Sequence, residues 1–227
     1  MSELPFDADL GAALEGRPTL VLASASPARL ATLRAAGVDP LVIVSDVDEE
    51  AVVARYGVTD AQDVALVLAR AKAEAVAPQA TDLEDGAGAL VLGCDSVLEL
   101  DGEVHGKPGT PDRARTRWHR MRGRSGVLHT GHWLVGARAD ADGGTGATLG
   151  AVASTTVHFA QLTDEEVDAY VATGEPLHVA GAFTLDARGG AYVRGVEGDH
   201  HNVVGVSLPL LRELLGEVEV PWHTLWR

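Results

Sequence analysis

Cysteine is nearly absent from this sequence of 227 residues, in which Cys94 is the only one. A lone thiol excludes an internal disulfide framework and suits a reducing compartment. Residues 1–18 lack the basic and apolar regions of a secretory signal. The longest uncharged run, residues 143–163, is rich in Gly, Ser and Thr, so it does not span a bilayer. The sequence therefore predicts a soluble, cytoplasmic protein.

Positive charge is scarce as well. The chain has 18 Lys and Arg residues against 33 Asp and Glu, and its formal net charge is −15. A chain this acidic has no general attraction for nucleic acids or for anionic membranes. A phosphate ligand would therefore have to be held by a local cluster of cations, by backbone amides or by a metal.

Lysine is the rarest charged residue, since 16 of the 18 basic residues are arginine and the two lysines are Lys72 and Lys107. Lysine supplies a compact, mobile point charge, whereas arginine supplies a rigid planar fork. Two lysines that escaped a composition bias would be the simplest explanation. Both, however, lie in segments that carry other candidate residues, so we expect each to serve in a phosphate site that does not tolerate arginine.

Apolar patterning and turn residues predict strands that alternate with helices in the first half of the chain and long strands in the middle. The fold class is therefore α/β with a mixed sheet. Residues 1–18 are expected to form a loose extension before a single domain of residues 19–227. The expected strands are 19–23, 41–45, 89–94 with a continuation at 97–100, 127–139, 147–160 and 191–196. The expected helices are 27–36, 61–77, 111–122, one capped by Thr163 that runs to Ala172, and 208–215.

Several common catalytic motifs are excluded. Gly106-Lys107-Pro108 lacks both the first glycine and the hydroxyl residue of a phosphate-binding P-loop. The chain has neither a dinucleotide fingerprint between a strand and a helix nor a nucleophile elbow. His129 and His132 would point to opposite faces of a strand, while His200 and His201 are adjacent, so neither pair is expected to chelate zinc.

Candidate functional residues stand at the ends of the expected elements. Asp95 follows a buried strand, where a carboxylate lies at a cleft, although a turn aspartate is the structural alternative. Glu49 lies in an acidic run after another strand, where a solvated loop charge is the alternative. Ser24, Ser26 and Arg29 surround a helix N-terminus, where capping explains Ser26 but not the arginine.

These residues supply two complementary sets of groups. Two carboxylates, Glu49 and Asp95, suit a hard divalent cation and a water molecule. Three cations, Arg29, Lys72 and Lys107, suit a polyphosphate beside a helix N-terminus. The combination indicates metal-assisted hydrolysis of a phosphoanhydride.

Short motifs along the chain give a more specific indication. They are, in order, SASPAR (24–29), VDE (47–49), ARAKA (69–73), CDS (94–96), GKP (106–108), LHTG (128–131), AGAF (180–183) and NVVG (202–205). In this order they resemble the Maf family of nucleoside triphosphate pyrophosphatases, and its actinobacterial members in particular. The resemblance covers roughly residues 19 to 216.

The resemblance implies hydrolysis of a canonical or non-canonical nucleoside triphosphate to the monophosphate and pyrophosphate, with Mg²⁺ or Mn²⁺. It implies that Asp95 accepts the proton of the attacking water, and that Glu49 and Asp95 bind the metal. It also implies an elongated mixed sheet flanked by helices, with two lobes around a nucleotide cleft, often in a homodimer. The substrate-binding set expected at this cleft is Ser24, Ser26, Arg29, Lys72, Lys107, Ser96 and Asp186.

Three positions linked to base choice in that family carry Ala28, Ser96 and Asp186. These residues match neither the branch that prefers dTTP and UTP (Arg, Thr and Gln) nor the branch that prefers 7-methyl-GTP (Trp, Gln and Glu), so the preferred base stays open. Two alternatives remain: a non-catalytic nucleotide-binding regulator of cell division, and an inosine/xanthosine triphosphate pyrophosphatase. The intact candidate carboxylates and lysines favour an enzyme over the regulator.

Overall fold

The computed structural model describes residues 18–81, 83, 88–137 and 147–227. The expected N-terminal extension, apart from Pro18, lies outside the described residues, and so do residues 138–146 between the two long middle strands. None of the helices in the described ranges is long and apolar enough to cross a membrane.

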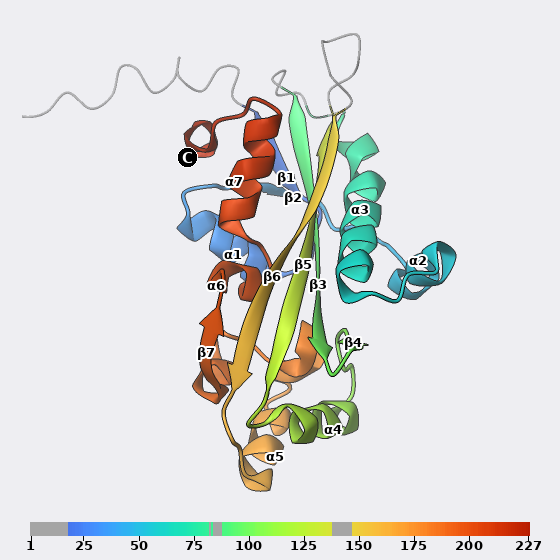
Figure 1. The fold of residues 1–227 in the computed structure, drawn as a ribbon. Coiled ribbons are helices and arrows are strands. Elements are labelled where there is room, and N and C mark those ends of the chain that lie inside the picture. Colours follow the sequence, from blue (N-terminus) through green and yellow to red (C-terminus); the bar gives the residue numbers. More distant parts are fainter. Residues whose placement is uncertain (1–17, 82, 84–87, 138–146) are drawn as a thin grey trace, which may run out of the picture.

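One mixed sheet of seven strands organises the molecule, in the order β2-β1-β3-β5-β6-β7, with β4 paired to the far end of β3. β1 pairs in parallel with β2 and β3, and all other pairings are antiparallel. The long strands β3, β5 and β6 give the fold its elongated shape (Figure 1). The strands are β1 (Thr19–Leu22), β2 (Leu41–Val42), β3 (Ala89–Leu100), β4 (Glu103–His105), β5 (Ser125–Gly136), β6 (Thr148–Phe159) and β7 (Val193–Glu197).

Helices cover both faces of the sheet. In Figure 1, α3 and α2 lie on one side of the long strands, α1, α6 and α7 lie on the other, and α4 and α5 close the lower end. The α-helices are α1 (Pro27–Ala35), α2 (Glu49–Tyr56), α3 (Ala61–Ala80), α4 (Pro111–Met121), α5 (Asp164–Ala172), α6 (His200–Val204) and α7 (Leu208–Glu217). Short 3₁₀ turns are η2 (Glu175–His178), η3 (Ala180–Ala182), η4 (Arg188–Tyr192) and η5 (Trp222–Leu225).

Two glycines allow α3 to lie directly on the sheet. A Cβ atom on Gly93 of β3 would lie 2.1 Å from the carbonyl oxygen of Ala69, and one on Gly131 of β5 would lie 2.2 Å from that of Ala65. Both distances are far below van der Waals contact, so only glycine permits this approach. The helix that carries Lys72 is therefore held close to β3 and β5.

The long strands pass through two main hydrophobic clusters, one toward each end. The cluster under α1 and α7 includes the fully buried Leu33 and Leu211. The cluster at the α4–α5 end is aromatic, with the Trp118 ring edge-on to Phe159 at 5.8 Å and to Tyr170 at 5.6 Å. These two clusters correspond to the two expected lobes, and the α/β class with an elongated mixed sheet is confirmed.

The largest departure from the expected elements lies between residues 41 and 56. The expected strand 41–45 is only two residues long, and the acidic run after it continues into α2 instead of remaining a loop. Asp48 caps α2 by accepting a hydrogen bond from the Ala51 amide at 3.0 Å, and Gly57 ends it in the left-handed conformation. Glu49 therefore stands at the first position of a helix, which holds its side chain in a defined direction.

Candidate active site

The open edge of β3 is the centre of the candidate site. On this edge β1 pairs with β3 from Ala89 to Leu92, and β4 pairs with it from Leu98 to Leu100. Residues 93–97 between these ladders face an opening on that edge. Successive side chains of a strand point to opposite faces of the sheet. Adjacent residues of β3 at this opening therefore contact helices on different faces. Asp95 bonds to α3, whereas Ser96 bonds to α1.

A buried ammonium joins two carboxylates on the α3 side of the opening. Lys72 donates to Asp95 Oδ1 and also to Glu49 Oε1, the latter at 2.7 Å. Lys72 and Asp95 are buried, with 8% and 5% of their surfaces exposed. The Lys107 ammonium lies 3.7 Å from the same Glu49 oxygen, but 56% of its side chain is exposed. The structure thus brings four predicted residues together, with Lys107 at the rim rather than in a buried pocket.

Burial and charge separate the pKa values of the two carboxyl groups. Burial raises the pKa of Asp95 above its ordinary value, and although the Lys72 charge opposes this, the nearby Glu49 adds to it. Burial also acts to raise the pKa of Glu49, but Lys72, Lys107 and Arg29 outweigh it and lower the pKa. Glu49 is therefore the more acidic partner, and Asp95 is the group with the greater affinity for a proton.

The Arg29 guanidinium ties together the other side of the opening. It donates to Ser24 Oγ at 3.1 Å, to Ser96 Oγ at 3.1 Å and to the Gly205 carbonyl at 2.7 Å. Ser26 caps α1 by accepting a bond from the Arg29 amide at 3.4 Å. The predicted Ser24, Ser26, Arg29 and Ser96 therefore form one cluster around the N-terminus of α1.

Two further residues support this cluster and were not identified as site residues from the sequence. Ser96 Oγ lies 2.9 Å from Thr130 Oγ1, and Thr130 donates to the Asn202 carbonyl at 3.1 Å. The Asn202 amide in turn donates to the Leu128 carbonyl at 3.2 Å. Thr130 belongs to the motif LHTG and Asn202 to the motif NVVG. Their membership in the ordered set of motifs was the sequence feature that could have identified them as site residues. Their roles depend on contacts between distant parts of the chain.

A cavity of about 630 Å³ lies beside Asp95 between α2, α3, β3 and β4. Its walls are largely apolar, and its charged lining residues are Glu49, Glu50, Asp95 and Lys107. The apolar wall residues are Val53, Ala54, Val58, Val64, Leu68, Val97 and Val104. Its volume lies in the range typical of sites for small organic ligands.

The three positions linked to base choice differ in the contacts that they form. Ser96 is part of the Arg29 cluster, and Ala28 lies in the first turn of α1 beside it. Asp186 is exposed between η3 and η4. Within the described residues it forms no hydrogen bond or ion pair with Asp95 or Arg29. The substrate-binding role expected of Asp186 therefore stays a prediction.

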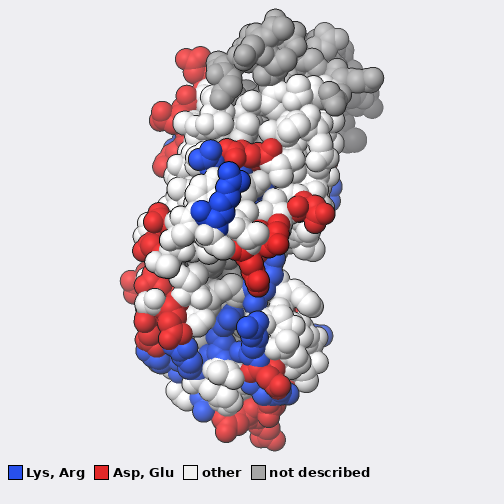
Figure 2. All heavy atoms as spheres, turned by 90° about the vertical axis from the view of Figure 1, so that its right-hand side faces the viewer, with Lys and Arg blue, Asp and Glu red and all other residues white. Residues whose placement is uncertain are grey.

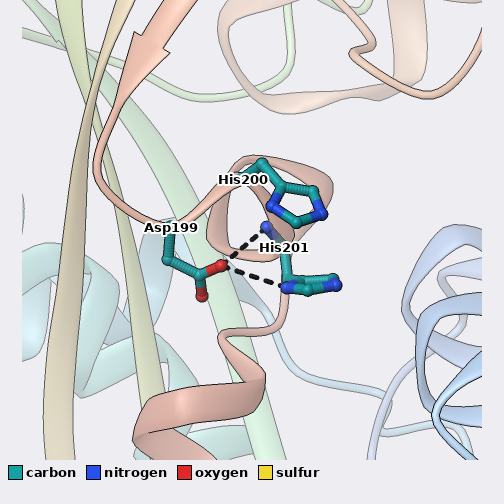
Figure 3. A group of neighbouring side chains, drawn as sticks. All are labelled: Asp199, His200 and His201. Atoms are coloured by element: carbon teal, nitrogen blue, oxygen red, sulfur yellow. Dashed lines mark hydrogen bonds and ion pairs between the residues drawn. The ribbon is translucent and has the colours of Figure 1, made fainter.

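The adjacent side chains of His200 and His201 lie close together at the start of α6. One ligand atom of each lies within 4.8 Å of the others and of an oxygen of Asp199, and the two rings are 3.8 Å apart at their centroids (Figure 3). The two rings converge because both turn toward the same side at the first turn of a short helix, and the expectation that this pair does not chelate zinc stays a prediction. Asp199 Oδ1 accepts bonds from the His201 amide at 2.9 Å and ring at 3.1 Å, so capping of α6 accounts for the arrangement.

Asp95 and Glu49 fit a hard divalent cation. Carboxylate oxygens are the ligands that Mg²⁺ and Mn²⁺ prefer. The Lys72 ammonium bonds to one oxygen of each carboxylate, Glu49 Oε1 and Asp95 Oδ1, and so holds the two groups close together. The donor set and the proximity of the two groups therefore suit a metal ion at the open edge of β3.

Comparisons with known proteins agree with the geometry. The family model described as Maf-like protein matches residues 19–218. Proteins named nucleoside triphosphate pyrophosphatase are 55% identical in Salinispora tropica (91% of this chain, 87% of that one) and 55% identical in Nocardia farcinica (92% and 97%). A solved dITP/XTP pyrophosphatase from Mycobacterium abscessus is 14% identical over 63% of this chain and 75% of that chain, with a TM-score of 0.33, too low to bear on this protein. The match over most of its length shows that the chain belongs to the Maf family.

Proposed function

We propose that this protein hydrolyses nucleoside triphosphates to nucleoside monophosphates and pyrophosphate, with Asp95 as the catalytic base. The observation that carries the proposal is the position of Asp95. Its carboxylate is buried, has a raised pKa and lies at the open edge of β3. Lys72 bonds to it on one face of the sheet, and Arg29 bonds to the adjacent Ser96 on the other. A base needs a pKa nearer to neutrality than that of an exposed aspartate, and burial supplies this shift.

The triphosphate would lie across the open edge of β3. Arg29 and the N-terminus of α1 approach this edge from one face of the sheet, while Lys72 and Lys107 approach from the other. A chain with a net charge of −15 repels a polyphosphate in general, so these local cations provide the attraction. Ser24 and Ser96 orient the guanidinium of Arg29, which is suited to bidentate phosphate binding.

Asp95 would accept the proton of the attacking water as the oxygen of that water bonds to phosphorus. The α–β phosphoanhydride bond then breaks, and pyrophosphate leaves with the bond's electron pair. Lys72 keeps the Asp95 carboxylate available in its ionised form by offsetting part of the cost of burial. The cavity beside Asp95 is large enough for the nucleoside, and its apolar walls suit a base.

A divalent cation, Mg²⁺ or Mn²⁺, would be held by Asp95 and Glu49. Such an ion neutralises phosphate charge and stabilises the charge that develops as the phosphoanhydride breaks. The role of this chain is to present the two carboxylates on separate elements, β3 and the first turn of α2.

We further propose that the enzyme acts in the cytoplasm on free nucleotides, and that it forms a homodimer. The acidic surface charge disfavours nucleic acid polymers and anionic membranes. Leu41, Val42 and Val44 are exposed at and beside the edge strand β2, which offers an apolar surface to a second copy. Light scattering on the purified protein would show twice the chain mass if this is correct.

The decisive experiment incubates the purified protein with a panel of canonical and modified nucleoside triphosphates, with Mg²⁺ or Mn²⁺, and identifies the phosphate product. Pyrophosphate in equal amount to the monophosphate is expected. Release of orthophosphate from the γ position without pyrophosphate would contradict the proposal. Binding without turnover of any substrate would favour a nucleotide-binding regulator.

A further inference from the structure

A second cavity, of about 400 Å³, lies between β4 and α4 on the face that carries the active-site cavity. Figure 2 shows this face, with Lys and Arg side chains gathered below its middle, where the surface is hollowed. The cavity shares no lining residue with the one beside Asp95. It is lined by His105, Asp112, Arg113, Thr116, Arg117 and Arg120.

Three arginines on one face of α4 leave this cavity with positive charge that is not neutralised. Arg120 pairs with Glu103 at 2.6 Å. Arg117 donates to the backbone carbonyl of Gly106, which carries no charge. The Arg113 side chain forms no hydrogen bond or ion pair with any other residue that the structure describes, whereas its backbone amide donates to Thr110 Oγ1. Asp112, the one carboxylate in the lining, bonds at 3.0 Å to Arg115, which lies outside the cavity.

Two side chains of the cavity, His105 and Arg117, lack the polar or charged partners that a ligand would supply. Nε2 of His105 is buried and has no hydrogen-bond partner among the described residues, and the nearby Glu103 Oε2 lies 3.8 Å from it, beyond hydrogen-bond distance. Such atoms are rare in folded proteins, because an unpaired buried polar group costs free energy. Burial, together with the charges of Arg113 and Arg120, lowers the pKa of Arg117 to about 10. Arg113 and Arg117 are thus held close to Arg120, and of the three arginines only Arg120 pairs with carboxylates, those of Glu103 and Asp101.

We propose that this cavity binds a phosphate chain of the size of pyrophosphate. Residues 113, 117 and 120 lie on one face of α4 because they are spaced by four and three positions. Guanidinium groups bind phosphate oxygens through paired hydrogen bonds, and the His105 ring supplies a further polar contact. The small volume of the cavity and the net negative charge of the chain fit a small anion rather than a nucleic acid.

An anion bound in this cavity would affect the active site through residues 105–107. His105 lines the arginine cavity, whereas Gly106 and Lys107 line the cavity beside Asp95. An anion that draws Arg117 away from the Gly106 carbonyl changes the position of the segment that presents Lys107. Pyrophosphate would therefore inhibit turnover from outside the catalytic opening. This second step rests on the proposed function, whereas the binding step does not.

The binding step is tested by titration calorimetry with inorganic pyrophosphate in the absence of divalent metal. The variants are Arg113→Gln and the double variant Arg113→Gln/Arg117→Gln, with Arg115→Gln on the same helix as the matched control. We expect the double variant to show one binding site fewer than wild type, or a roughly tenfold or greater loss of affinity at that site. Arg115→Gln should bind as wild type.

Three results would overturn the binding step. One is unchanged pyrophosphate binding by a folded double variant. Another is equal loss of binding in the Arg115→Gln control. The third is displacement of pyrophosphate by sulfate at the same concentration, which would indicate a general anion surface. Arg113→Gln keeps the bond between Arg117 and Gly106, so it provides the test if the double variant does not fold.

Two further experiments identify the molecule that supplies the phosphate chain and measure the effect of its binding on turnover. A nucleoside triphosphate analogue with a methylene bridge between the α and β phosphates replaces pyrophosphate in a parallel titration. If the analogue loses a site in the double variant and pyrophosphate does not, the cavity binds the substrate's phosphates instead. In assays of turnover, the pyrophosphate concentration for half inhibition should rise roughly tenfold in Arg113→Gln. Unchanged inhibition despite lost binding would refute the coupling, and failure of the proposed activity would leave the binding arm intact.

Discussion

Gly131 lies directly opposite Asp95 in the ladder between β5 and β3. The absence of a side chain at Gly131 lets the backbone of α3 approach the sheet at Ala65, and the same helix carries Lys72 to Asp95. The contact between Lys72 and Asp95 therefore depends on the absence of a methyl group on the neighbouring strand.

Gly131→Ala should separate α3 from the sheet and weaken the contact between Lys72 and Asp95. A new Cβ 2.2 Å from the Ala65 carbonyl oxygen cannot be accommodated without a backbone shift, so we expect unfolding free energy to fall by about 1–3 kcal/mol. Turnover should fall as well. The control is Gly216→Ala, where a Cβ meets no atom within 4 Å, and urea denaturation with kinetics checks both. Equal stability and activity in the two variants would contradict this account.

Asp95→Asn should abolish most turnover while the protein stays folded. The amide cannot accept the water's proton or carry the negative charge that binds a metal, and loss of a general base typically costs ~10²–10⁴-fold. The matched control is Asp39→Asn, an exposed carboxylate paired with Arg34. kcat and the melting temperature should be measured together. Near-normal kcat in Asp95→Asn would remove this residue from the catalytic role.

Lys72→Arg should lower turnover much more than Lys107→Arg. Lys72 is buried between two carboxylates, so the wider guanidinium must displace at least one of them, and misplacement by about one ångström can cost on the order of 10²-fold. Lys107 is largely exposed at the rim, where a guanidinium has room, so its replacement should mainly change KM. Steady-state kinetics on the best substrate distinguish the two. Wild-type kinetics in Lys72→Arg would show that the scarcity of lysine has no functional meaning.

His132 should make the protein less stable in acid. Its ring is fully buried, accepts a bond from the Ser207 amide at 2.8 Å, and burial lowers its pKa to about 4. Between the unfolded value of 6.5 and this folded value, the unfolded chain binds a proton that the native protein does not, so unfolding free energy falls with decreasing pH. The loss is at most about 1.4 kcal/mol per pH unit.

The variant His132→Gln tests this pH dependence because its amide oxygen can still accept the Ser207 bond but does not titrate. Urea denaturation across this pH range should give a shallower slope for His132→Gln than for wild type. The exposed His178→Gln serves as the control and should keep the wild-type slope. Equal slopes in all three proteins would exclude His132 as the source.

The long elements of the fold were predictable because their side chains repeat with a clear period. The helix beginning at Ala61, the long middle strands and the capping box of Thr163 and Glu166 all lie close to their expected positions. α2 was not predictable from apolar spacing, because it has no buried residue and its start depends on capping by Asp48. The short β4 and α6 gave too few residues for any period.

The residues of the site were predictable as types, but their contacts were not. Asp95, Glu49, Lys72 and Arg29 stand at element ends or in ordered motifs, and the structure brings them to one opening. The sequence could not reveal that Lys72 bonds to both carboxylates, because this depends on how closely α3 approaches the sheet. Asp186 was chosen by its position in a family motif alone, and its exposed place in the fold gives it no described contact with the cluster.

The uninterrupted pairing of β3 with β5 from Leu90 to Glu99 has a consequence for how such enzymes diversify. This ladder fixes the backbone at Asp95 whether or not a ligand fills the opening on the other edge, so little reorganisation is needed there when substrate arrives. The borders of the opening belong to the turn before α1, to α2 and to the segment after β4, which are separate short segments. Each border can be exchanged without moving the carboxylate, so one hydrolytic centre can be inherited unchanged while the choice of nucleobase is altered around it.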